Sequence, residues 1–177
     1  MQSLILPAIG TDRPGLVEEL SAAVAANGGN WLKSRMSHLG GEFAGIVRIQ
    51  VDEAKETALR SALATLDGLE VTVRTDTSGV DPAGTGELVA LELMGADRPG
   101  IVSEISRALA ALGVNVENLE TECTSAPMSG EALFKANAEL GLPAGLDLTG
   151  LQSALEGIAS DLIVDLKLRE NTGALRS

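Results

Sequence analysis

The sequence predicts an α+β protein built from two ferredoxin-like domains in tandem, each with the element order βαββαβ. Three observations lead to this fold class: a long internal repeat, the same succession of hydrophobic periods in both copies, and a short polar segment between them. Each domain is expected to be a four-stranded antiparallel sheet with two helices on one face. The predicted domains are residues 1–74 and 87–168, with a linker at 75–86 and a flexible tail at 169–177.

The internal repeat is centred on one hexapeptide. "GTDRPG" (Gly10–Gly15) follows the apolar run "LILPAI", and "GADRPG" (Gly95–Gly100) follows "LVALELM" 85 positions later. Residues 10–30 and 95–115 are identical at 13 of 21 positions without a gap. Because a solenoid needs at least three stacked units, two copies indicate two related globular domains.

In the first copy the hydrophobic period changes from strand to helix and back. After the first strand, apolar residues recur at helical spacing, at Leu16, Val17, Leu20 and Val24. A strand over 30–39 is followed by the turn "LGGE" and by "EFAGIVRIQV", whose alternation is typical of a strand with one wet face. A second helix over 58–66 and the alternating "LEVTVR" complete the domain.

The second copy repeats this order of elements. They are expected at 87–94, 101–112, 114–123, 130–140, about 148–160 and 161–168. The gapless register is expected to extend to Gly45 and Gly130. The second copy is about eight residues longer, and we assign these residues to a loop insertion at "GLPAGLDL" (141–148), which leaves the sheet intact.

The composition limits the classes of function. The net charge is −12, which argues against direct binding of nucleic acid or of an anionic membrane surface. No apolar run approaches the roughly 20 residues of a membrane-spanning helix, and the N-terminus lacks the features of a secretory signal. A single cysteine, Cys123, forms no intrachain disulfide, so a cytoplasmic location is expected.

The repeated hexapeptide has two interpretations, and both stay open from the residues alone. In the first it is turn chemistry: Gly10 lets the chain leave the strand sharply, Asp12 caps the helix, and Pro14 presets φ in the first helical turn. In the second, the N–H groups and dipole of the helix bind the carboxylate of a free amino acid, while Asp12 or a neighbouring carbonyl binds its ammonium group. The amides of Asn30 and Asn115 are candidate partners of the two loops.

The stretches "GTDRPGLVEELSAAVAANGGN" and "GADRPGIVSEISRALAALGVN" resemble the signature of the ACT domain, a small βαββαβ regulatory module. Two such domains without an attached enzyme, together with "SRMSHLGGEFAGIVRI", resemble the glycine cleavage system transcriptional repressor family. The resemblance implies a non-catalytic protein that binds a free amino acid, with glycine and serine as candidates, where the first loop and helix meet a second domain. It also implies a protein partner, such as a transcription factor or an enzyme, rather than DNA. A homo-oligomer is expected.

The motif positions supply the expected ligand-binding residues. In the first domain they are Gly10, Thr11, Asp12, Arg13, Pro14, Gly15 and Asn30, and in the second Gly95, Ala96, Asp97, Arg98, Pro99, Gly100 and Asn115. Because Ala96 lacks the hydroxyl group of Thr11, the two sites need not share a ligand or an affinity.

Other candidate sites are weaker. His38 and Cys123 occupy equivalent positions of the repeat, but a Cys–His nucleophile needs the two to meet and needs a third residue to orient the base. One His and one Cys form no metal-ligand cluster, so we expect no metal, no cofactor and no catalytic residue. Trp31, with Lys33 and Arg35 alternating after it, is either a binding edge or a strand whose cations discourage edge pairing.

Two other functions compete with amino-acid sensing. The main alternative is a pure protein-interaction or assembly module that binds no ligand and uses the hexapeptides as turns. An enzyme on the same fold, such as an acyl phosphate hydrolase, is disfavoured because the sequence has no glycine-rich loop that ends in a positioned arginine.

Overall fold

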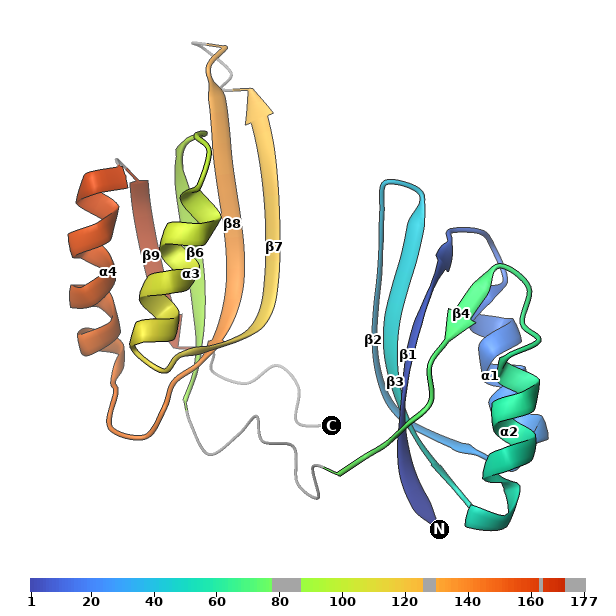
Figure 1. Cartoon of the computed structure of the whole chain (residues 1–177). Coiled ribbons are helices and arrows are strands. Elements are labelled where there is room, and N and C mark those ends of the chain that lie inside the picture. Colours follow the sequence, from blue (N-terminus) through green and yellow to red (C-terminus); the bar gives the residue numbers. More distant parts are fainter. Residues whose placement is uncertain (78–86, 126–129, 163, 171–177) are drawn as a thin grey trace. The chain divides into compact units, whose positions relative to one another are not determined.

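The structure, a computed structural model, describes residues 1–77, 87–125, 130–162 and 164–170 (Figure 1). The chain divides into two compact units, Met1–Gly79 and Val80–Ser177, each with its own sheet and its own hydrophobic core. Most of the predicted linker (78–86) and most of the predicted tail (171–177) lie outside the described residues.

Domain 1 has the predicted order of elements. They are β1 (Gln2–Thr11), α1 (Leu16–Ala26), β2 (Asn30–Leu39), β3 (Glu42–Val51), a 3-10 turn (Glu53–Lys55), α2 (Glu56–Leu63), β4 (Leu69–Val71) and β5 (Arg74–Thr75). The strands are antiparallel in the order β2-β3-β1-β4, and β5 also pairs with β1. The predicted last strand "LEVTVR" is therefore divided into two short pieces, and Thr75, the first residue of the predicted linker, belongs to β5.

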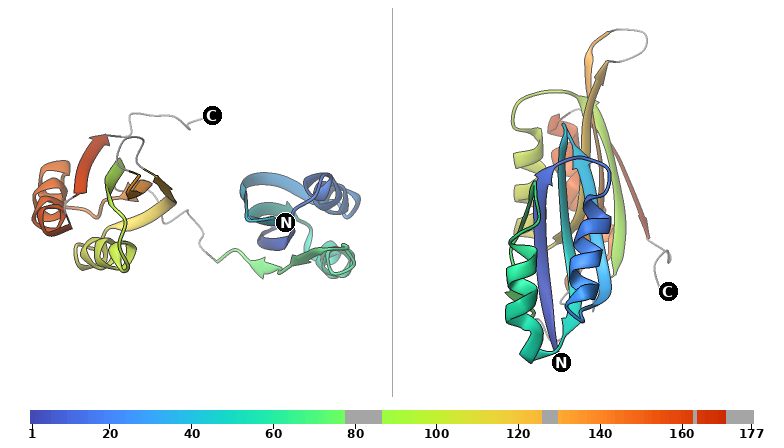
Figure 2. Two further views of the ribbon diagram at one scale, coloured as in Figure 1. Left: turned by 90° about the horizontal axis from the view of Figure 1, so that it is seen from above. Right: turned by 90° about the vertical axis from the view of Figure 1, so that its right-hand side faces the viewer.

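Domain 2 repeats the topology. Its elements are β6 (Leu88–Ala96), α3 (Ile101–Ala111), β7 (Asn115–Ser125), β8 (Ala132–Gly141), α4 (Leu148–Leu162) and β9 (Val164–Glu170). The four strands are antiparallel in the order β7-β8-β6-β9. In both domains the two helices lie on one face of the sheet (Figures 1 and 2), so the prediction of two ferredoxin-like βαββαβ sandwiches in tandem is confirmed.

Each core lies between the sheet and the two helices, so strands bury alternate residues there and helices bury residues at helical spacing. Alternate residues of β1 are buried, namely Leu4, Leu6 and Ala8, because one face of the strand meets the helices. α1 buries residues at helical spacing, at Leu16, Leu20 and Val24. Val17, which was predicted on the same helical face, is 45% exposed. Within the described residues, no polar or charged side chain is buried, so the cores are apolar throughout.

The hairpin between β2 and β3 is confirmed. β2 ends at Leu39 and β3 begins at Glu42, so only two residues connect the strands. These are Gly40 (φ 61°) and Gly41 (φ 83°), which both have the positive φ that a type I′ turn requires. This tight turn sets the register of the β2–β3 pair in domain 1.

The predicted register of the second hairpin is wrong. Phe43 pairs with His38 in domain 1, and Phe134 pairs with Cys123 in domain 2, so Phe43 and Phe134 are equivalent and Gly45 corresponds to Ala136 rather than to Gly130. Phe43 follows His38 by five positions, whereas Phe134 follows Cys123 by eleven. Most of the extra residues of domain 2 therefore lie in the β7–β8 connection and not at "GLPAGLDL". A gapless alignment misses a longer turn when glycines happen to match across it.

Candidate ligand site at the first loop of each domain

The repeated hexapeptide forms a tight turn before each helix. Gly15 has φ 97° and ψ −11°, and Gly100 has φ 90° and ψ −3°. A proline followed by a glycine of positive φ is typical of a type II turn. α1 begins only after Gly15, whose carbonyl accepts a hydrogen bond from the N–H of Glu19 at 2.9 Å. The N-cap residues are glycines that make no side-chain capping bond.

The predicted cap of α1 therefore lies three residues too early, whereas the range 101–112 predicted for the second copy begins at the first residue of α3. Asp12 is not the N-cap of α1, and Pro14 precedes the first helical turn instead of lying in it. Pro14 was assigned to the first helical turn, but a proline followed by a glycine, here Gly15, favours a turn of its own. Both predictions about the cap are wrong, whereas the left-handed conformation explains why residue 15 must be glycine.

Gly10 has a different role from the predicted sharp exit. Residues 10 and 11 still belong to β1, where Gly10 pairs with Phe43 and Leu69. A Cβ atom at residue 10 would lie 2.0 Å from the carbonyl oxygen of Gly68. Gly10 is therefore required by the close approach of the loop that leads into β4.

Each loop arginine is paired within its own domain. Arg13 donates to both carboxylate oxygens of Glu19, at 2.6 and 2.8 Å, and also to the carbonyl oxygen of Asp67 at 3.0 Å. Arg98 makes the same bidentate pair with Glu104, at 3.0 and 2.6 Å. Each pair links the Pro–Gly turn to the start of the helix that follows, so the arginines hold the loop in position.

The sequence reasoning missed the glutamates of these two pairs. A signal was available, because Glu19 and Glu104 are among the identical positions of the repeat. The hydrogen bond from Arg13 holds the pKa of Glu19 below its ordinary value, and the same bond raises the pKa of Arg13. In domain 1 the pair is therefore fully ionised at neutral pH.

A backbone hydrogen bond ties each loop to the neighbouring hairpin. The N–H of Asp12 donates to the carbonyl oxygen of Gly41 at 2.8 Å, and the N–H of Asp97 donates to that of Ala132 at 2.9 Å. Both Asp side chains are exposed, so their carboxylates are accessible at the surface of the loop. The loop thus combines the start of a helix with one accessible carboxylate, which suits a zwitterionic ligand.

The two asparagines lie far from the loops of their own domains. Gly10 pairs with Phe43 near the start of β3, whereas Asn30 pairs with Gln50 near its end. The 11 residues of α1, about 16 Å of helix, separate the turn from the start of β2. In domain 2 the amide of Asn115 donates to Glu117 at 2.5 Å. A single domain does not bring the predicted ligand residues together, and their joint role stays a prediction.

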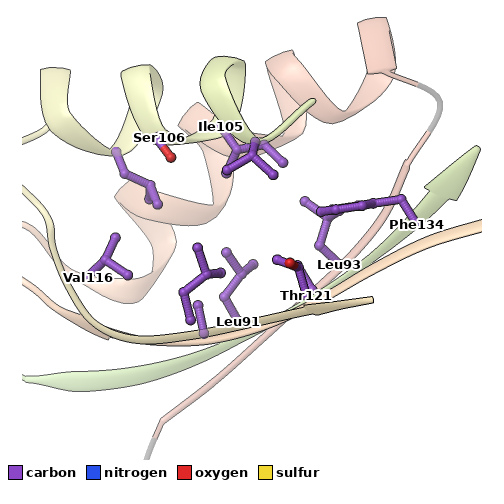
Figure 3. Close-up of a pocket in the computed structure, with 12 residues that line it drawn as sticks. Leu91, Leu93, Ile105, Ser106, Val116, Thr121 and Phe134 are labelled. Atoms are coloured by element: carbon purple, nitrogen blue, oxygen red, sulfur yellow. The ribbon is translucent and has the colours of Figure 1, made fainter. Parts of the chain in front are cut away.

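Domain 2 also contains an apolar pocket that the sequence reasoning missed. It lies between α3 and the sheet, has a cavity volume of about 30 Å³, and is lined by apolar side chains with the hydroxyl groups of Ser106 and Thr121 (Figure 3). A cavity of this size has room for a water molecule. In domain 1 the positions of Val116 and Thr121 are taken by Trp31 and Met36, which pack against the core. The smaller side chains of Val116 and Thr121 were the sequence signal that could have indicated this pocket.

Cys123 and His38 do not form a nucleophilic pair within either domain. They are structurally equivalent, because each pairs with the phenylalanine of its own sheet, but they belong to different domains. Partial desolvation raises the pKa of the Cys123 thiol, and the charge of Asp97 and its hydrogen bond add to this effect. A raised pKa leaves less thiolate at neutral pH, which is the opposite of an activated cysteine.

The described residues contain neither a metal-ligand cluster nor a helix that could span a membrane. No group of three or more His, Cys, Asp and Glu side chains in this part of the chain is placed to hold a metal ion. None of its helices is long and apolar enough to cross a membrane.

Comparison with known families and structures identifies the domains. Residues 2–75 and residues 89–134 each match the ACT domain. The chain belongs to the ACT domain family. The matched residues include both Pro–Gly turns and both Arg–Glu pairs described above.

Several known proteins are similar to the whole tandem of ACT domains. The glycine cleavage system transcriptional repressors of Escherichia coli (strain K12) and Shigella flexneri are each 26% identical to this chain over 163 residues, which cover 90% of this chain and 85% of theirs. An unknown protein from Galdieria sulphuraria has a crystal structure with a TM-score of 0.81 and 32% identity, covering 96% of this chain and 98% of that one. The crystal structure of a candidate glycine cleavage system transcriptional repressor shares the fold, with a TM-score of 0.74 and 22% identity over 96% and 98% of the two chains.

Proposed function

We propose that this protein is a non-catalytic regulator that senses a free amino acid and passes the signal to a protein partner, such as a transcriptional activator or an enzyme. The observation that carries the proposal is the tandem of ACT domains, at residues 2–75 and 89–134. The similarity to glycine cleavage system transcriptional repressors supports a role in transcription regulation, with glycine and serine as the first ligands to test. The net charge of −12 favours a protein partner over DNA.

The proposed ligand position is the first loop, at the start of α1 or α3. The N–H groups and the positive dipole end of the helix attract the carboxylate of the ligand, and Asp12 or Asp97 pairs with its ammonium group. Because Asn30 lies at the other end of its own domain, it would reach a loop only from another ACT domain, as when the exposed β2 edges of two copies of the chain pair antiparallel. The ligand then favours one arrangement over others and changes the affinity for the partner.

Isothermal titration calorimetry of the full chain with glycine, serine and the other common amino acids tests the sensing function. We expect saturable binding heat with at least one of them. Thr11→Ala should weaken a domain 1 site by about tenfold, because it removes a hydroxyl group that can hydrogen-bond the ligand. Ala96→Ser is the matched variant in domain 2 and should leave the domain 1 site unchanged. Absence of heat at millimolar concentrations of every amino acid would contradict the proposal.

One observation favours the second candidate function, a pure interaction module. In both loops the arginine is engaged by a glutamate and one backbone N–H is engaged by the neighbouring hairpin, so the turns are complete without a ligand. A pull-down with a candidate activator, repeated with and without amino acid, separates the two functions. If the protein is a sensor, the amount retained with the activator changes when amino acid is added. If it is a pure interaction module, the same amount is retained in both cases.

Direct binding to DNA is the outcome that would redirect the proposal. A gel shift with duplex DNA at physiological salt is expected to show no complex, because the acidic chain repels the phosphate backbone. If the protein partner is a DNA-binding activator, adding that partner to the same reaction should produce a shift. A shift with this chain alone would show that it acts on DNA itself.

A further inference from the structure

The sheet face that the helices leave uncovered carries a cationic group in domain 1. Burial alternates along the strands, so the residues between the core positions lie on this uncovered face. On β2 and β3 they include Lys33, Arg35 and Arg48, with Lys33 directly opposite Arg48 in the register. Arg48 is already paired with Asp76 at 2.5 Å, and Glu42 adds one acid at the hairpin end. We call Lys33, Arg35 and Arg48 the basic face.

The equivalent β7–β8 surface of domain 2 has the opposite sign. The register assigns the equivalence, because Lys33 pairs with Arg48 as Asn118 pairs with Glu139. The positions of Lys33, Arg35 and Arg48 are taken by Asn118, Glu120 and Glu139, and Glu122 follows on the same face of β7. Lys135 is the cation of this β7–β8 surface and lies 3.5 Å from Glu122. We call Glu120, Glu122 and Glu139 the acidic face.

Exposed apolar side chains accompany the charges on both faces. In domain 1, Ile9 and Ile46 are 52% and 56% exposed, and both lie between core positions of their strands. In domain 2, Leu88 and Met94 of β6 are 42% and 44% exposed on the corresponding side. Single exposed apolar residues are ordinary, but these lie on the same faces as the charges, so a contact between the two faces would also bury apolar surface.

We propose that two copies of this chain form a dimer in which the basic face of domain 1 in one copy docks on the acidic face of domain 2 in the other. A second molecule of this chain is the partner that the charges favour, because each chain carries both a basic face and a complementary acidic face. A twofold axis repeats the contact, so each dimer contains it twice and leaves neither half exposed. The inference does not depend on amino-acid sensing.

Sedimentation velocity of the full chain across the micromolar range tests for this dimer. We expect a concentration-dependent dimer that dissociates as salt is added, because screening weakens contacts between exposed charges. Lys33→Glu with Arg35→Glu (variant A) should weaken dimerisation by about tenfold or more, because acidic groups then face acidic groups in both contacts. Glu120→Lys with Glu122→Lys (variant B) should weaken it similarly, because cations then face cations.

Mixing the two variants is the decisive measurement. In a dimer of one A chain and one B chain, the acidic domain 1 face of A meets the cationic domain 2 face of B, and the remaining contact has its native charges. Two chains that each dimerise poorly should therefore form a heterodimer with an affinity near that of the original protein. A contact made within one chain would leave the original protein monomeric at every concentration, so sedimentation of the original protein separates that case from the dimer.

Matched controls carry the same charge changes away from the uncovered faces. Lys55→Glu with Arg107→Glu and Glu18→Lys with Glu53→Lys alter exposed side chains elsewhere and should dimerise like the original protein. Thermal unfolding verifies that variants A and B are folded, and Lys33→Gln with Arg35→Gln replaces variant A if it is not. A monomer at every concentration, or variants A and B that dimerise normally, would overturn the proposal. So would a mixture that shows no heterodimer.

Discussion

The two ACT domains share their turns and differ on their surfaces. The Pro–Gly turn, the bidentate Arg–Glu pair and the apolar face of the first helix are the same in both. In contrast, domain 1 fills the groove beside its first helix with Trp31 and Met36, whereas domain 2 has Val116 and Thr121 there and contains a pocket. The uncovered β2–β3 and β7–β8 surfaces also have opposite charges. The repeat retains what a βαββαβ unit needs to fold and varies the residues that a ligand or partner would meet.

The largest expected effect concerns the close approach at Gly10. Gly10→Ala should lower the free energy of unfolding of domain 1 by about 1–3 kcal/mol, because its Cβ would overlap the backbone carbonyl of Gly68. Urea denaturation measures the change. The matched substitution Gly157→Ala in α4 meets no atom within 4 Å and should raise the stability of domain 2 by about 0.5–1 kcal/mol. Equal effects at both positions would show that packing at Gly10 is not the cause.

Exchanging the equivalent residues Met36 and Thr121 tests why the groove beside the first helix is filled in domain 1 and open in domain 2. Met36→Thr, which introduces the domain 2 residue, should cost domain 1 about 1–3 kcal/mol, because it opens space beside the core. Thr121→Met should not stabilise domain 2 by itself. Met36 packs over Gly45, where a Cβ would lie 2.8 Å from the Met36 side chain, and domain 2 has Ala136 at that position.

A double-mutant cycle tests this coupling between the strands. Thr121→Met combined with Ala136→Gly should be more stable than the sum of the two single changes, because the glycine makes room for the longer side chain. Urea denaturation of the four proteins gives the coupling. If the two changes are additive, the small residue opposite Met36 does not explain how domain 1 fills its groove.

The Arg–Glu pair of domain 1 should make a smaller contribution that depends on pH. Because the pKa of Glu19 is lowered in the folded state, its stabilising contribution is present above the ordinary pKa of a glutamate and is lost as the pH falls through the lowered pKa. Thermal unfolding of the original protein and of Glu19→Gln should therefore differ at neutral pH and converge at acidic pH. A difference that does not change with pH would contradict this role.

The smallest effect concerns the thiol of domain 2. Asp97→Asn should lower the pKa of Cys123 and speed its alkylation at neutral pH, because the charge of Asp97 is one cause of the raised pKa. The effect should be partial, since desolvation is the larger cause. The alkylation rate as a function of pH measures the pKa directly, and an unchanged profile would show that Asp97 does not act on the thiol.

Some features of the candidate site were predictable from local sequence and others were not. The position of the loop between strand and helix follows from the change in hydrophobic period around "GTDRPG". The predicted cap at Asp12 was wrong because proline and glycine formed a turn before the helix began. The separation of Asn30 from the loop was missed because it depends on which end of the sheet each strand occupies.

The sequence by itself determined the duplicated unit, the order of its elements and the sides of the helices that face the core. These depend on periodicity and turn chemistry, which act between residues close in the chain. Only the tertiary structure decided the equivalence of Phe43 and Phe134, the Gly10–Gly68 approach, the pocket of domain 2 and the opposite charges of the two uncovered faces. Each of these depends on strand register, which pairs residues that are distant in sequence and that no local pattern can assign.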